Sequence, residues 1–137
     1  YGGRAINITQ TTAAHAFSYK ITSLYKLPHG HAVAVGLPVI WRYMLSNFDR
    51  CIDVRGTDYL ESIFTEISKS MECSSPTEAI EVFERMMSDM ELANPVAGNR
   101  EEELQVLSTS VNPVRLRNNP ILIDIPAARK LYSIIVK

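Results

Sequence analysis

Thr11–Gly36 reads TTAAHAFSYKITSLYKLPHGHAVAVG, and the interpretation of the whole chain starts from this stretch. All three histidines of the protein, His15, His29 and His31, lie within it. The stretch is rich in small residues and free of acidic ones. The rest of the chain shows the amphipathic periodicity of ordinary core-forming helices. Any chemistry that the sequence carries is therefore expected here.

The first half of this stretch predicts a helix with one apolar and one polar side. Helical periodicity runs from about Arg4 to Tyr25. Its apolar side carries Ala13, Phe17, Ile21 and Leu24. Its polar side places hydroxyl groups around one imidazole, and consists of Thr11, His15, Ser18, Tyr19 and Thr22. Because Lys20 is the only charged residue between Arg4 and Lys26, we expect both sides to be buried, the polar one facing a site or another domain.

A second helix is expected from Pro28 to about Asn47. Pro28 suits the first helical position, where a missing N–H has no cost. The residues from Ala32 to Trp41 are apolar on every side, which predicts a central, fully buried helix. Pro38 lies inside it and is expected to kink it by removing a hydrogen bond.

The remaining segments predict further helices. Thr57–Met71 is expected to bury Leu60, Ile63, Phe64, Ile67 and Met71. Ser75-Pro76-Thr77-Glu78 is a capping box that opens a helix with an inward stripe of Ala79, Phe83, Met86 and Met90. The other expected elements are a helix from the acidic turn Glu101–Glu103 to about Ser110, a short turn over Pro113–Arg117, a loop at Asn118–Pro120, and a last helix that starts at Pro126 and buries Leu131, Ile134 and Ile135.

The fold class that follows is all-α, a helical bundle of six or seven helices. Ile121–Ile125 is the only candidate strand, and it is short. Residues 1–137 have the length of one domain. The chain starts without methionine and enters a helical pattern almost at once, so we expect it to be the C-terminal part of a longer protein.

Composition excludes several classes of partner. Hydrophobic content of 46% with 21% charged residues is typical of a globular protein. A net charge of −1 gives no electrostatic basis for binding nucleic acid. The longest apolar run, Ala32–Trp41, is well short of the roughly 20 residues that span a bilayer. Two cysteines without a CxxC pattern favour a reducing cytoplasm and buried thiols.

His15 and His29 leave two interpretations open. One lies on a helix and the other opens the next helix, so both imidazoles can meet at one point and bind a transition metal. Each can equally be a hydrogen-bonded histidine of a helical core, and two ligands are fewer than the three that catalytic metal sites normally take from the protein. His31 cannot easily share an ion with His29, so we interpret it as a supporting or structural residue.

Residues Ala13–Pro38 resemble the iron-containing (group III) alcohol dehydrogenase family. In that family a buried helix carries a metal-binding histidine, and a second follows within Pro-His-Gly, before small apolar residues and Leu-Pro. The positions that match are His15, Pro28, His29, Gly30, Leu37 and Pro38. The strings GRAINIT, SYKITSLY and PHGHAVA are most similar to the branch whose members reduce phosphonoacetaldehyde.

The resemblance implies the helical, metal-binding C-terminal domain of a two-domain enzyme with the dehydroquinate-synthase-like fold. His15 and His29 would be two of four ligands to one Fe²⁺ or Zn²⁺, and the other two would lie upstream of this chain. NAD(H) or NADP(H) would bind mainly to an N-terminal α/β domain that this chain lacks. Where many members carry another histidine near the nicotinamide, this chain has Tyr19, which is expected to contact nicotinamide or substrate, or to pack.

The implied function is the NAD(P)-linked reduction of a small aldehyde. The implied substrate is phosphonoacetaldehyde, which would give 2-hydroxyethylphosphonate. The fragment alone would be inactive. The implied partners are the aldehyde or alcohol, the protein's own N-terminal domain and, as an open alternative, a second copy in a homodimer. Lys20 and Lys26 are candidate partners for a phosphonate, although solvated lysines are the simpler interpretation. One alternative function is that of a dehydroquinate-synthase-like lyase domain. His31 argues against it, because that group has a glutamate at this position. A non-catalytic helical interaction module is the other.

Overall fold

The computed structural model describes residues 2–137, and within them it contains helices and no strand. The elements are α1 (Gly2–Ile8), α2 (Ala13–Tyr25), α3 (His29–Leu45), the 3₁₀ turn η1 (Phe48–Arg50), α4 (Thr57–Ser70), α5 (Pro76–Asp89), α6 (Arg100–Ser110), α7 (Pro113–Leu116) and α8 (Ile125–Ile135). The all-α prediction is confirmed. Ile121–Ile125 is not a strand: Ile121 forms a single antiparallel bridge with Cys51, and Ile125 already begins α8.

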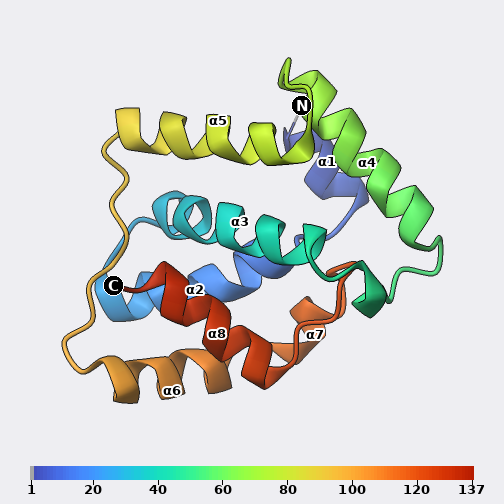
Figure 1. The fold of residues 1–137 in the computed structure, drawn as a ribbon. Helices are drawn as coiled ribbons and strands as arrows, with labels where there is room; N and C mark the ends of the chain where they lie inside the picture. Colours follow the sequence, from blue (N-terminus) through green and yellow to red (C-terminus); the bar gives the residue numbers. More distant parts are fainter. Residues whose placement is uncertain (1) are drawn as a thin grey trace.

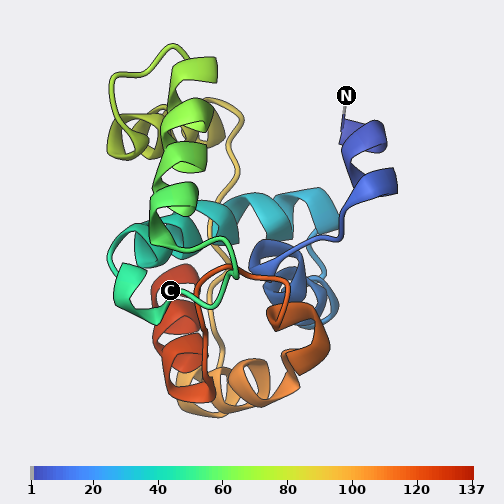
Figure 2. The ribbon, with the colours of Figure 1, turned by 90° about the vertical axis from the view of Figure 1, so that its right-hand side faces the viewer.

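The helix expected over Arg4–Tyr25 is two helices, which corrects the sequence-based prediction. The chain leaves helical conformation between Ile8 and Ala13, where three of four residues are threonines. Threonine is stiff at χ1 and its hydroxyl competes for backbone hydrogen bonds, so this segment favours a break. Thr12 has extended backbone angles (φ −107°, ψ −155°) and forms the N-cap of α2. Figure 2 shows α1 set apart from the other helices.

Helix α3 is the central element of the bundle. It packs against α2, α5 and α8, and it lies between α5 on one side and α2 with α8 on the other (Figure 1). The prediction of a central helix is confirmed, but its complete burial is not. Val33, Leu37 and Val39 are only partly buried, because neighbouring helices cover α3 on some of its sides and leave others open. The helix continues through Pro38, which is itself buried.

The core between α2 and α8 is organised by two aromatic residues. The rings of Phe17 and Tyr132 stack with centroids 4.4 Å apart, and neither side chain is exposed. The Tyr132 hydroxyl donates to the backbone oxygen of Phe17 at 3.1 Å. Burial raises the pKa of Tyr132 well above its ordinary value, so the hydroxyl keeps its proton. This contact joins the helix that carries His15 to the last helix of the chain.

Several side chains expected in the core are exposed instead. On α5 the buried residues are Ala79, Ile80 and Met87, whereas Met86 and Met90 are 49% and 57% exposed. Positions seven and eight residues along a helix both fit its period, so spacing alone does not distinguish Met86 from Met87. The same kind of error places Leu24, Ile67 and Ile134 inside, whereas each of them is partly exposed.

Side-chain caps support the predicted starts of α5 and α6. Ser75 Oγ accepts from the backbone N–H of Glu78. The Glu78 carboxylate in turn accepts from the backbone N–H of Ser74 rather than from that of Ser75. Asn99 caps α6 directly before its acidic first turn. Within residues 2–137, no helix combines the length and apolarity that a membrane span requires.

Replacing Tyr132 by phenylalanine is expected to lower the free energy of unfolding by about 1 kcal/mol, because one buried hydrogen bond is lost while the stacked ring remains. Chemical denaturation would measure the change. Tyr59→Phe is the matched control, because the Tyr59 hydroxyl accepts from Arg55 at the surface. Its effect should stay within about 0.5 kcal/mol. Equal losses in the two variants would contradict the role assigned to Tyr132.

Candidate metal centre

The connection between α2 and α3 determines where the histidines lie. Lys26 ends α2 with left-handed backbone angles (φ 57°, ψ 25°), a conformation that lysine rarely adopts. Pro28 is the N-cap of α3 (φ −54°, ψ 142°), one residue before the helical position expected for it. His29 is therefore the first residue of α3, and the turn places its side chain against residues from the first two turns of α2.

The imidazoles of His15 and His29 meet directly. His15 Nδ1 and His29 Nε2 are 3.2 Å apart, so one of these nitrogens donates a hydrogen bond to the other. The ring centroids are 5.2 Å apart and the ring planes are tilted by 46°. His15 is half-buried and His29 is exposed. The structure thus brings together the two histidines selected from the sequence.

Ser18 supports this pair, and sequence reasoning missed its role. Its hydroxyl is completely buried and donates to the backbone oxygen of His15 at 2.9 Å. Because its hydrogen is engaged there, Ser18 Oγ can only accept from His29 Nδ1, which lies 3.4 Å away. A proton on Nδ1 leaves the Nε2 lone pair of His29 directed at the partner histidine. The signal in the sequence was the position of Ser18 one turn after His15 on the polar side of the helix.

The electrostatic environment favours the neutral form of His15. Its pKa is lowered first by burial, then by His29 and then by the Arg115 guanidinium. A neutral imidazole has a free lone pair, which is the form that binds a metal ion.

The two ring nitrogens fit adjacent positions in a metal coordination sphere. Two nitrogen ligands at the usual zinc–nitrogen distance of about 2.0–2.1 Å, at the tetrahedral angle, are separated by roughly 3.3 Å. The observed separation of 3.2 Å agrees with that value. Among residues 2–137, no group of three or more histidine, cysteine, aspartate or glutamate side chains could hold a metal ion. This part of the chain therefore offers two donors to such a centre.

Tyr19 connects the histidine pair to a cation on α7. Its ring lies against His29 with centroids 5.3 Å apart. Its hydroxyl accepts from an N–H of Arg115 at 2.7 Å, and the guanidinium carbon lies 4.5 Å from the ring centroid. Arg115 did not stand out in the sequence, because 96 residues separate it from Tyr19 and no local motif marks it.

His31 lies outside the cluster. Its Nε2–H donates to the backbone oxygen of Ala93 at 2.8 Å, which ties α3 to the segment after α5. This contact agrees with the structural interpretation of His31 made from the sequence.

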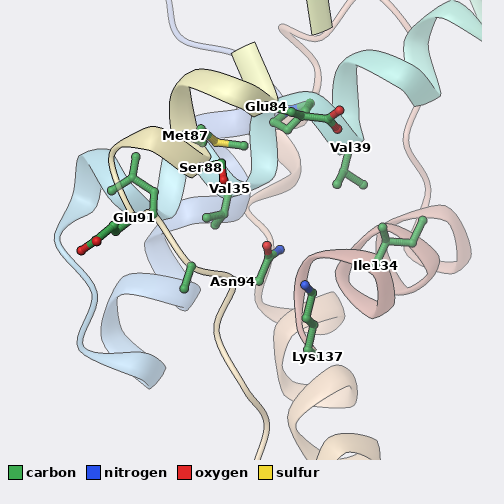
Figure 3. A pocket seen from close by; sticks show the side chains of 12 residues that line it. Val35, Val39, Glu84, Met87, Ser88, Glu91, Asn94, Ile134 and Lys137 are labelled. Atoms are coloured by element: carbon green, nitrogen blue, oxygen red, sulfur yellow. The ribbon is translucent and has the colours of Figure 1, made fainter. Parts of the chain in front are cut away.

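Two hollows in the surface differ in their relation to the histidines. One, of about 590 Å³, adjoins Tyr19 and is lined by Thr9, Gln10, Thr11, Tyr19, Asn112, Val114, Arg115 and Asn118. The other, of about 580 Å³, lies between α3, α5 and α8 (Figure 3). Its lining includes Val35, Met87 and Ile134 but no histidine, and it shares no residue with the first.

Comparisons with known proteins agree with the resemblance noted from the sequence. The model of the Fe-containing alcohol dehydrogenase family, C-terminal, matches residues 1–133. A phosphonoacetaldehyde reductase from Streptomyces viridochromogenes is 29% identical over 125 residues, which are 90% of this chain and 31% of that protein. The chain thus spans about a third of the length of this relative. No solved structure is significantly similar to the chain. With nearly all of its residues matched, this chain belongs to the Fe-containing alcohol dehydrogenase family and corresponds to its C-terminal domain.

Proposed function

We propose that this chain is the metal-binding C-terminal domain of an NAD(P)-linked aldehyde reductase, in which His15 and His29 are two of the metal ligands. The observation that carries the proposal is the 3.2 Å approach of His15 Nδ1 and His29 Nε2 in a chain matched over residues 1–133 by this family. The metal would be Fe²⁺ or Zn²⁺. When bound, it would act as a Lewis acid that polarises the aldehyde oxygen.

The chain's own residues prepare this site. Ser18 Oγ accepts from His29 Nδ1, so the Nε2 lone pair of His29 is directed toward His15 and would be available to a metal ion. Burial lowers the pKa of His15 and favours the lone-pair form. The Tyr19 ring lies against His29, with the ring centroids 5.3 Å apart, and we propose that this ring contacts nicotinamide or substrate.

The proposed enzyme has two domains. Support for a second domain comes from the relative, because this chain covers only 31% of its length. In this proposal an N-terminal α/β domain binds NAD(H) or NADP(H) and supplies the remaining metal ligands. Reduced nicotinamide bound there would supply a hydride to the carbonyl carbon, and with a proton on the oxygen the products would be the alcohol and the oxidised cofactor. This chain alone would be inactive.

Phosphonoacetaldehyde is the proposed substrate, with 2-hydroxyethylphosphonate as its product. Support for this finer assignment comes from the relative described as a phosphonoacetaldehyde reductase. A panel of aldehydes offered to the full-length protein with NADH and with NADPH tests it directly. Aldehyde-dependent oxidation of either cofactor, fastest with phosphonoacetaldehyde, is the expected result. Absence of oxidation with every aldehyde would contradict the reductase assignment.

His15→Ala and His29→Ala are each expected to remove most of the bound metal, because each deletes one ligand. Elemental analysis of the full-length protein should find near-stoichiometric iron or zinc in the wild type and little in either variant. His31→Ala is the control, since His31 donates to a backbone oxygen and should not affect metal content. Full occupancy in both His15→Ala and His29→Ala would show that the assignment is wrong.

Ser18→Ala is expected to weaken metal binding by about 10- to 100-fold, because His29 loses the acceptor that fixes its tautomer. Competition with a chelator would measure the affinity. Ser23→Ala is a matched control on the same helix: its hydroxyl donates to the backbone oxygen of Lys20, as that of Ser18 does to His15. Equal affinities in Ser18→Ala and Ser23→Ala would exclude the supporting role.

A further inference from the structure

Arg115 differs from the arginines that pair with carboxylates in this protein. Salt bridges in residues 2–137 join Arg42 to Glu84, Arg50 to Asp124, Arg55 to Asp53 and Arg129 to Glu101. None of the salt bridges in this part of the chain includes Arg115, although its side chain is half-buried. A positive charge that the described chain does not neutralise is available to an external anion.

The Arg115 guanidinium is held in place by Tyr19. One N–H donates to the Tyr19 hydroxyl at 2.7 Å, and the guanidinium carbon lies 4.5 Å from the ring centroid. A guanidinium has five N–H donors, so several remain after this bond. A fixed guanidinium with free donors matches the geometry of a phosphonate or carboxylate, which accept two parallel hydrogen bonds.

The hollow beside Tyr19 supplies the rest of an anion site. Its volume is about 590 Å³, and no aspartate or glutamate lines it. Residues with hydroxyl or amide side chains line the hollow together with Arg115, among them Thr9, Gln10 and Asn118. Asn118 Nδ2 donates to Gln10 Oε1 at 2.8 Å, and this bond leaves the amide N–H groups of Gln10 free to turn toward a ligand.

The hollow adjoins the histidine pair through one side chain. Tyr19 contacts His29 with its ring and Arg115 with its hydroxyl. Tyr19 therefore contacts both the cation that lines the hollow and one histidine of the His15–His29 pair. A short molecule with a carbonyl at one end and an oxyanion at the other carries the two groups that such neighbouring sites would bind.

We propose that Arg115, Tyr19 and the hollow beside them bind the oxyanion group of a short-chain aldehyde and thereby select anionic aldehydes over neutral ones. The inference rests on the proposed function, which places the aldehyde carbonyl at His15 and His29. It defines the substrate class as short aldehydes that carry a phosphonate or a carboxylate.

Binding of methylphosphonate to the full-length protein tests the anion site without any turnover. Isothermal titration should give saturable binding to the wild type and a Kd raised by about tenfold or more in Arg115→Gln. Arg115→Lys keeps the charge without the planar fork, so its Kd should lie between those two values. Arg117→Gln, two residues along the chain and outside this hollow, is the matched control and should bind as the wild type does. Thermal melting of every variant confirms that it is folded.

The same titration distinguishes the two anions. Tighter binding of methylphosphonate than of acetate assigns the site to phosphonates, and the reverse order assigns it to carboxylates. No saturable binding of either anion by the wild type would overturn the inference, as would an unchanged Kd in folded Arg115→Gln.

Kinetics separates this inference from the proposed function. The ratio of kcat/KM for phosphonoacetaldehyde to that for propanal should fall by about tenfold or more in Arg115→Gln. An unchanged ratio in an active enzyme would overturn the anion site and leave the reductase intact. Loss of methylphosphonate binding in Arg115→Gln, in a protein that reduces no aldehyde at all, would support the anion site and overturn the reductase.

Discussion

The turn at Lys26–Pro28 folds α3 against α2, and the candidate site depends on that contact. It brings His29 to His15 and Ser18, which lie in the first two turns of α2. Without the turn, the two imidazoles would lie far apart along one helical rod. The left-handed conformation of Lys26 is compensated by the packing of the two helices that it joins.

The rest of the bundle holds this pair of helices from outside. Tyr132 of α8 stacks on Phe17 and donates to its backbone oxygen, on the side of α2 opposite the site. Tyr25 at the end of α2 donates to Glu103 of α6 at 2.6 Å, which lowers the pKa of that carboxylate. Arg115 of α7 bonds to Tyr19 beside the histidines. Elements from the last third of the chain thus determine the surroundings of residues near its start.

Local signals in the sequence predicted much of the fold, and long-range contacts account for what was missed. A capping residue such as Ser75 acts within one turn, so the helix start at Pro76 could be recognised. The exposure of Met86 depends on which neighbouring helix covers α5, which periodicity does not encode. His15 and His29 were found because one short connection joins them. Arg115 was missed because its approach to Tyr19 is created entirely by the tertiary fold.

Anomalous diffraction from crystals of the metal-loaded full-length protein would show whether His15 and His29 share one metal ion. Data collected on both sides of the iron or zinc absorption edge locate the ion independently of the protein model. We expect one anomalous peak at about 2.0–2.3 Å from both His15 Nδ1 and His29 Nε2. A fully occupied peak that contacts neither nitrogen would contradict it.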